Sequence, residues 1–326
     1  MSACVTKFRQ TDKPTNRQTD TPTHRQAPLE KRQMKQLLLI IALLSSLTAG
    51  AQRERVSRGF KDTRAVNIHS VETLPKGKLD VRISHRFGDL FGDDGGWQTF
   101  YGLEQAEDVA IGAEYGFSNT FTAGLYRAKG GGATPFGQTG LRRNINGVLK
   151  TRVLHQETSG MPLSMAVVGN VTFSTDSKIE GNDNLIQSFP EFSHRFAFNA
   201  SAVVARKFGD KFTFELVPGV THRNLVPFEG ENTLFSLGSA ARYQITRVLA
   251  VMADITVPFS STITPDNGYS YPLGLGFEWD TGGHVFQLNF TNATGIFETD
   301  YIPYTSSSWG DGEFRMGFTI SRWFNL

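Results

Sequence analysis

Hydrophobic and polar residues alternate along much of this chain, which is the pattern of β-strands with two unlike faces. From Leu79 to Phe87 every second residue is apolar or aromatic, apart from His85, and the residues between are Asp, Arg or Ser. Similar segments lie at 109–117, 121–125, 163–173, 212–216, 249–257, 286–291 and 314–321, and weaker ones at 141–154, 194–207, 232–243 and 271–279. The pattern predicts an all-β protein with about twelve strands, each near the ~9–11 residues that cross a bilayer when tilted.

The connections between these segments alternate between short and long. Short connections lie near residues 118, 158, 209, 245 and 281. Longer ones, rich in Gly, Asp, Ser and Pro, lie at about 88–107, 129–140, 175–193, 223–231, 260–270 and 292–312. An up-and-down transmembrane barrel produces this rhythm, whereas a Greek-key sandwich has no reason to keep it. We therefore expect one antiparallel barrel in a bacterial outer membrane, with short periplasmic turns, long outer loops and both termini in the periplasm.

The N-terminal region divides into three parts before the predicted barrel at 78–326. Residues 34–51 carry a short basic start, an apolar stretch from Leu37 to Leu47 and a small-residue cleavage site, so they are predicted to be a signal peptide. The polar residues 1–33 are interpreted as upstream sequence read in frame or, alternatively, a leader. Residues 52–77 are predicted to be a periplasmic segment.

The charge of the chain changes once these segments are set aside. Residues 1–51 hold 8 of the 33 basic and 3 of the 31 acidic residues, which leaves 25 basic against 28 acidic residues. No basic surplus remains that would point to nucleic acid. The single cysteine, Cys4, also lies in the part set aside, so the predicted barrel has no thiolate or disulfide chemistry.

Ionisable residues on the predicted strands fall mostly on the polar face, which in a barrel lines the lumen. A charge on the lipid face would cost roughly 2–4 kcal/mol at mid-bilayer. The candidate lumen-lining residues are Arg82, Arg86, Glu114, Lys150, Arg152, Glu215, Arg242, Asp254, Glu278 and Arg315. They could line a path for a small polar or anionic solute, or they could form an ion-pair network that closes a narrow barrel. The sequence leaves both open.

Three functions follow from these alternatives. The first is a passive channel for small polar or anionic solutes. The second is a non-conducting surface or scaffold barrel that binds a partner through its long outer loops. The third is a membrane-embedded hydrolase, for which the sequence offers no catalytic motif such as GxSxG. We expect that the protein is not an enzyme.

Two segments resemble known outer-membrane sequences. Residues 70–77, Ser-Val-Glu-Thr-Leu-Pro-Lys-Gly, run into Arg82-Ile83-Ser84-His85-Arg86-Phe87-Gly88, and together they resemble the opening of an uncharacterised outer-membrane β-barrel family with a domain of unknown function. The C-terminal residues 321–326 are similar to the aromatic terminal strand that outer-membrane assembly machinery recognises. The resemblance implies an outer-membrane barrel surrounded by lipid and lipopolysaccharide, and it brings no catalytic or binding residues.

No pattern in the sequence predicts a cofactor or a metal site. The histidines are scattered and lack the spacing of metal ligands. The run Gly130-Gly131-Gly132 lacks the strand-to-helix context of a phosphate cradle, so a flexible loop tip is the favoured interpretation.

Overall fold

The computed structural model describes residues 54–182, 185–227 and 230–326 of the chain. The chain divides into two compact units, Met1–Gln52 and Arg53–Leu326, and the second unit contains all of the described residues. The predicted upstream segment at 1–33 and the predicted signal peptide at 34–51 lie outside the described residues.

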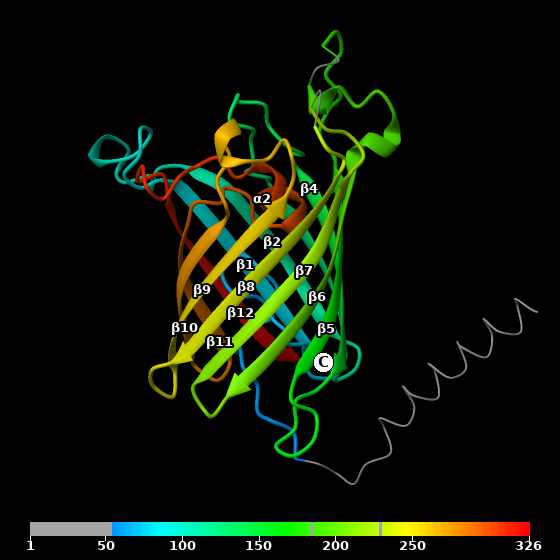
Figure 1. Cartoon of the computed structure of the whole chain (residues 1–326), viewed down its shortest axis with the longest axis vertical. Helices are drawn as coiled ribbons and strands as arrows, with labels where there is room; N and C mark the ends of the chain where they lie inside the picture. The colour runs from blue at the N-terminus through cyan, green and yellow to red at the C-terminus, as the bar shows by residue number, and fades with distance from the viewer. Residues whose placement is uncertain (1–53, 183–184, 228–229) are drawn as a thin grey trace, which may run out of the picture. The chain divides into compact units, whose positions relative to one another are not determined.

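The described part of the chain forms a closed barrel of twelve antiparallel strands, each paired with its neighbours in the sequence (Figure 1). Closure comes from the pairing of the first strand with the last, in which Ile83 lies opposite Ile320. The strands are β1 (Lys78–Asp89), β2 (Ala106–Gly116), β3 (Phe121–Ala128), β4 (Asn144–Leu154), β5 (Ser164–Ser174), β6 (Phe196–Phe208), β7 (Phe212–Arg223), β8 (Thr233–Gln244), β9 (Leu249–Phe259), β10 (Leu273–Asp280), β11 (His284–Thr291) and β12 (Arg315–Asn325). The predicted up-and-down barrel is confirmed, and its four weaker segments are β4, β6, β8 and β10.

The period-two alternation of the sequence separates the inside of the barrel from the outside. In β1, Asp80 and Arg82 are buried in the interior, whereas Val81 and Ile83 are about two-fifths exposed on the outer wall. One residue of register slip would exchange these two faces. The outer wall is therefore largely apolar, as a bilayer requires, and most charges of the strands face inward.

The two ends of the barrel differ in the length of their connections. Figure 1 shows short turns and the C-terminus at one end and long loops at the other. Gly209 and Gly282, in the turns after β6 and β10, adopt positive φ angles of 58° and 85°. Glycine suits these positions because it has no Cβ to clash in the left-handed region.

Residues 59–74 lie inside the barrel, where they form what we call the lumenal hairpin. The chain enters at the short-turn end, where Val56 donates to the carbonyl of Gln156. It folds back on itself through Ala65 N–H donating to Ile68 O and Ser70 N–H donating to Thr63 O. The segment 52–77 was predicted to be periplasmic, but most of it fills the lumen. The reason is that its apolar and polar side chains both find partners on the inner wall.

The loop between β11 and β12 enters the lumen from the opposite end. Its residues 292–305, which we call the lumenal loop, include the helix α2 (Glu298–Tyr304), all of whose residues are buried. Ala293, Ile296 and Phe297 before the helix are buried as well. The hairpin and the loop together occupy the interior that the twelve strands enclose.

No helix in the described ranges is both long enough and apolar enough to cross a membrane.

The outer wall can be tested by placing a charge on it. Ile111, in the middle of β2, is 54% exposed on the lipid-facing side. We expect Ile111→Arg to lower the free energy of unfolding in lipid vesicles by roughly 2–4 kcal/mol, because the guanidinium would face hydrocarbon. The matched control is Thr120→Arg in the exposed β2–β3 turn, which should change it little. Urea titration of the two refolded variants measures the difference, and equal effects would contradict a lipid-facing Ile111.

Candidate functional site

All ten predicted lumen-lining residues face the interior, and most of them bind the lumenal hairpin. Nine are buried, and the Arg152 side chain is 8% exposed. Those that contact the hairpin are Arg82, Arg86, Lys150, Arg152, Glu215, Arg242 and Asp254. Glu114 and Glu278 bind wall neighbours, Tyr126 and Arg242, and Arg315 binds the lumenal loop at the carbonyl of Asn292. The wall charges thus meet across an inserted segment.

Lys150 on β4 holds both arms of the hairpin. Its Nζ donates to the main-chain carbonyls of Thr63 at 2.6 Å, Ser70 at 3.0 Å and Glu72 at 3.2 Å. These three acceptors replace the water that a buried ammonium group loses. Lys150 therefore fixes the spacing of the two arms as well as their position.

Asp254 on β9 binds the turn of the hairpin. Its carboxylate accepts hydrogen bonds from the main-chain N–H groups of Asn67 and Ile68 and, at 2.7 Å, from the Asn67 side-chain amide. Successive N–H groups of a tight turn form a common anion-binding arrangement. The side-chain oxygen Oδ1 of Asn67 in turn accepts from Arg86 Nη2 at 2.7 Å.

Small residues on the inner wall make room for this turn. A Cβ added to Gly274 would lie 2.6 Å from Val66 Cγ1, and one added to Gly276 would lie 2.9 Å from Val66 Cγ2. The inward positions of β10 are thus shaped to the hairpin. This indicates a fitted contact between Val66 and the wall.

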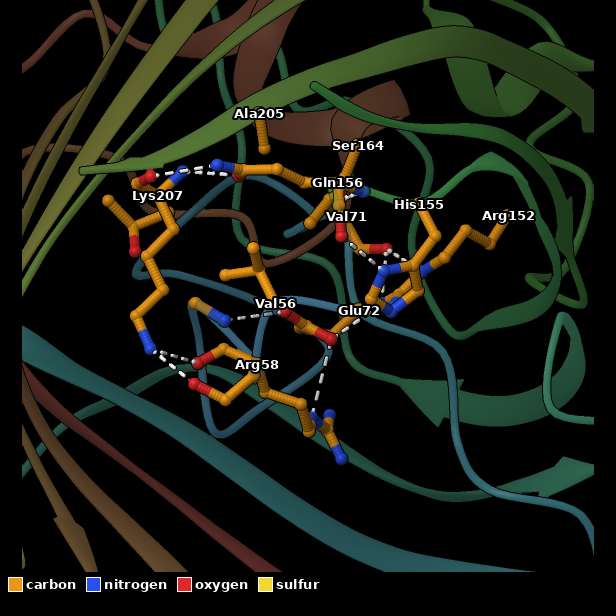
Figure 2. A pocket seen from close by; sticks show the side chains of 13 residues that line it. Val56, Arg58, Val71, Glu72, Arg152, His155, Gln156, Ser164, Ala205 and Lys207 are labelled. Carbon is orange, nitrogen blue, oxygen red and sulfur yellow. Dashed lines mark hydrogen bonds and ion pairs between the residues drawn. The ribbon is translucent and has the colours of Figure 1, made fainter. Parts of the chain in front are cut away.

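The hairpin is also anchored where it enters the barrel, as Figure 2 shows. The Glu72 carboxylate accepts hydrogen bonds from Arg152 on β4 and, at 2.9 Å, from the Gly59 N–H. It also forms an ion pair of 3.3 Å with Arg58. Lys207 on β6 donates to Ser57 Oγ at 2.6 Å. Despite burial, which alone would raise it, the pKa of Glu72 is lowered because Arg58 and Arg152 stabilise its charged form. The entrance is a cationic clamp around one carboxylate.

The hairpin and the lumenal loop meet at Arg64. Its Nη2 donates to Glu298 Oε1 at 2.7 Å and to the carbonyl of Ile296 at 3.2 Å, and its Nη1 lies 2.9 Å from His69 Nε2. The guanidinium also lies 5.6 Å from the centre of the Phe297 ring. One side chain of the hairpin therefore joins the two inserted segments.

A second carboxylate fastens the lumenal loop to the loop between β3 and β4. Asp300 accepts from the N–H groups of Gly131 at 2.9 Å and Gly132 at 3.0 Å. The glycine run was predicted to be a flexible loop tip, but Gly130, Gly131 and Gly132 are buried. A Cβ at Gly132 would lie 2.3 Å from Asp300 Oδ1, so glycine permits the contact.

Several of these residues were not among the sequence candidates. Asp62, Arg64, Asn67, His69 and Glu72 belong to the hairpin, which has no strand alternation to mark it. Asp80 and Asp108 already lie on the polar face in the sequence pattern, so that pattern could have added them to the lumen-lining candidates. The glycines at 274 and 276, both inward on one strand, were the available signal that something approaches the wall closely.

Two small voids border the hairpin. One lies at the entrance among Arg58, Glu72, Arg152 and Lys207, and another lies between Ile68 and Tyr301; each has a volume of about 10 Å³. Such a void holds roughly one water molecule. Among the described residues there is also no group of three or more His, Cys, Asp or Glu side chains that could hold a metal ion.

Comparison with known proteins places the chain in a structural context. A family model described as a membrane-bound β-barrel domain, DUF5777, matches residues 60–324, which include all of the lumenal hairpin except Gly59. No curated protein matches the sequence.

Solved structures with a similar fold include porins and a channel. The NanC porin is 9% identical with a TM-score of 0.42, and the KdgM porin is 6% identical with a TM-score of 0.44; each comparison covers 76% of this chain and 100% or 99% of the other. The COG4313 outer membrane channel from Pseudomonas putida F1 is 11% identical, with a TM-score of 0.42, over 78% of this chain and 98% of that one.

The hold of Lys150 on the hairpin can be measured by amide exchange. We expect Lys150→Met to weaken the attachment by about 3 kcal/mol, because three buried carbonyls lose a charged donor. That corresponds to roughly a hundred-fold faster exchange of the amides in residues 63–72 if local opening controls exchange. The control is Lys211→Met, at an exposed turn. Unchanged protection of the hairpin in Lys150→Met would contradict the role given to Lys150.

The attachment should also depend on pH through His69. Burial and the nearby charges of Arg64, Lys150 and Arg82 keep the pKa of His69 well below its usual 6.5. A released hairpin would expose His69, which would then take up a proton near pH 6.5. Because the released state binds the proton and the bound state does not, the attachment weakens as pH falls below about 6.5.

Hydrogen exchange of the hairpin between pH 7.5 and 5, corrected for the intrinsic rate, tests this dependence. We expect the natural protein to lose more protection in the acidic half of the range than His69→Gln does. The control His222→Gln, on the outer wall, should follow the natural protein. Profiles of the natural protein and His69→Gln that change equally with pH would contradict the role given to His69.

Proposed function

The chain belongs to the family of membrane-bound β-barrel domains, and we propose that it is an outer-membrane channel for small polar solutes that its own lumenal hairpin holds closed. The observation that carries the proposal is the occupation of the lumen by residues 59–74 through polar contacts with the wall. The barrel fold is porin-like. Because its lumen is filled, it corresponds to a closed channel and not to a freely open one.

The chemistry of the contact surface supports a removable hairpin. Filling a barrel with apolar side chains would be the more stable way to make it permanently solid, because buried charges lose hydration that their partners only partly replace. Here Lys150, Asp254 and Glu215 bind main-chain groups of the hairpin. Water can replace each of these contacts after release, so the wall left behind would already be a polar surface.

The wall charges favour polar solutes without a strong preference for anions. The ten predicted residues comprise six cations and four carboxylates, and the other buried strand charges, Asp80, Asp89, Asp108 and Arg223, bring both signs to seven. An anion-selective pore needs a surplus of cations. The balanced wall therefore supports the broader of the two solute classes expected from the sequence.

A non-conducting scaffold barrel is the second candidate. It is favoured by the lumenal loop, which closes the other end through Asp300 and meets the hairpin at Arg64. Two inserted segments that support each other would suit a barrel that never opens. The two candidates differ in whether release of the hairpin creates a conducting path.

Conductance in planar bilayers tests the proposal with a lock and a release variant. The lock is Val66→Cys with Gly276→Cys. A Cβ at residue 276 would lie 2.9 Å from Val66 Cγ2, so cysteines at the two positions would be close enough to form a disulfide. The release variant is Lys150→Met with Asp254→Asn. We expect at least ten-fold more frequent openings in the release variant than in the natural protein, and none when the oxidised lock is added to it.

The controls separate the outcomes. Lys211→Met with Asp210→Asn changes the same residue types in an exposed turn and should behave as the natural protein does. Reduction of the lock should restore openings. Steady conductance that oxidation leaves unchanged would show that the hairpin is no barrier. Silence of a folded release variant, and of a folded variant without residues 57–74, would favour the scaffold.

A further inference from the structure

The outer wall of the barrel has a hollow that the lumenal contacts do not explain. It has a volume of about 550 Å³, within the range of small-molecule sites (about 300–1,000 Å³). It lies along β4 to β7, where most of the residues that border it face outward and the inward-facing Gly124, Val148, Asn170 and Asn199 complete its lining. The outward-facing residues are Gly147, Leu149, Gly169, Val171, Phe198, Ala200, Val220 and His222.

The hollow exists because three neighbouring outward positions carry small residues. Gly147 lies opposite Val171, Gly169 lies opposite both Leu149 and Ala200, and the larger side chains of these pairs form its sides. A Cβ added to Gly147 or Gly169 would meet nothing within 4 Å. These glycines are therefore not required by packing or by backbone conformation, although they weaken a strand. An occupant from outside the chain would account for them.

A cluster of phenylalanines marks the level of the membrane surface beside the hollow. The rings of Phe173, Phe192, Phe196 and Phe198 contact one another with centroids 4.9–6.2 Å apart. They sit at the long-loop ends of β5 and β6, where aromatic girdles occur in outer-membrane barrels. The hollow begins immediately below them, in the half of the wall nearer to the long loops.

Basic side chains lie on the rim, at the long-loop ends of β3, β4 and β6. Arg127 is exposed at the end of β3 and donates to Thr175 Oγ1 at 2.8 Å and to the carbonyl of Arg143. The Arg143 side chain is 65% exposed and forms a long ion pair of 3.5 Å with Asp176. Arg195 donates to the carbonyl of Asp176 at 2.6 Å. Only Arg143 pairs with the Asp176 carboxylate, whereas Arg127 and Arg195 donate to hydroxyl and main-chain oxygens, so the rim carries more cationic than anionic groups among these residues.

The spacing of rim and hollow fits a lipid with an anionic headgroup. Gly147 follows Arg143 by four residues, which is roughly 13 Å along a strand and about 10 Å of depth at the usual tilt. That depth lies within one leaflet, since the apolar band of such barrels is about 25 Å tall. An acyl chain in the hollow would therefore place its headgroup at the arginines.

We propose that the hollow and the rim together form a binding site for lipid A, the phosphorylated glycolipid anchor of lipopolysaccharide. Arg127 and Arg143 bind a phosphate group, and one acyl chain fills the space above Gly147 and Gly169. Guanidinium groups suit phosphate because their forked donors can bind two oxygens at once. The choice of lipid A over a phospholipid rests on the orientation predicted from the sequence, in which the long loops face the cell exterior and lipid A is the anionic lipid of that leaflet.

Native mass spectrometry of the refolded, lipid-free barrel in detergent tests the site. The ligand is hexa-acylated bisphosphorylated lipid A, compared with dephosphorylated lipid A and with phosphatidylglycerol. We expect the bisphosphorylated form to bind at least ten-fold more tightly than either. Arg127→Gln with Arg143→Gln should remove that preference.

The hollow is tested separately by filling it. Gly147→Leu with Gly169→Leu should fold at least as well as the natural protein, because both side chains have open space, yet bind lipid A at least ten-fold more weakly. The matched control is Ala241→Leu with Ala253→Leu, a cross-strand pair of small outward residues elsewhere on the wall. For the rim the control is Arg206→Gln with Arg322→Gln, two exposed arginines at the short-turn end.

Each other outcome overturns the assignment. Equal binding of phosphatidylglycerol would show a site for any anionic lipid, and equal binding of dephosphorylated lipid A would exclude the arginines as phosphate ligands. Full binding by the filled variant would exclude the hollow as the acyl site. Equal losses in the control pairs would show that lipid A coats the barrel without a defined site.

Discussion

Closure of the sheet is the constraint from which the rest of this structure follows. Inside a bilayer no water is available for unpaired N–H and C=O groups, so β1 must pair with β12 and every strand must have two neighbours. Closure by twelve strands creates an interior that is wide enough to hold an inserted peptide segment. Because side chains alternate, the charges excluded from the lipid face gather in that interior, and they need partners there. The lumenal hairpin supplies those partners.

The hairpin solves two electrostatic problems at once. The wall brings cations and carboxylates into a space where isolated charges would be costly, and a peptide backbone offers both acceptors and donors in a compact form. Lys150 uses the carbonyls of Thr63, Ser70 and Glu72, while Asp254 uses the N–H groups of the turn. All three of these hydrogen-bond partners of Lys150 are main-chain carbonyls, so the hairpin backbone, and not a carboxylate side chain, accepts its hydrogen bonds. A backbone inserted at this position satisfies charges of either sign.

The sequence predicts the barrel well because the alternation that marks each strand is a local pattern. It predicts the interior poorly because the contents of the lumen depend on contacts between residues far apart in the sequence. Alternation in β1 or β5 depends only on which side of one strand meets lipid, so the faces and nearly all strands could be found from single segments. The hairpin has no such period: Ala65, Val66 and Ile68 are apolar because they face the inner wall at distant strands. Their environment is set by residues such as Gly276, about two hundred positions away. The wall charges were placed on the correct face, but their partners could not be known before the hairpin was placed.

Glycine leaves space on both faces of the wall. On the inner face this space is already filled, whereas on the outer face it is open. At Gly274 and Gly276 the missing side chain is already replaced, since an added Cβ would collide with Val66 and Asn67 of the hairpin. At Gly147 and Gly169 an added Cβ would meet nothing, so the space remains open toward the bilayer. An isolated strand gains nothing from glycine, which lowers its stability without providing a side chain to pack. Inside the barrel the compensation is the hairpin, whereas outside it must come from the membrane, and an acyl chain is the membrane component with the shape to provide it.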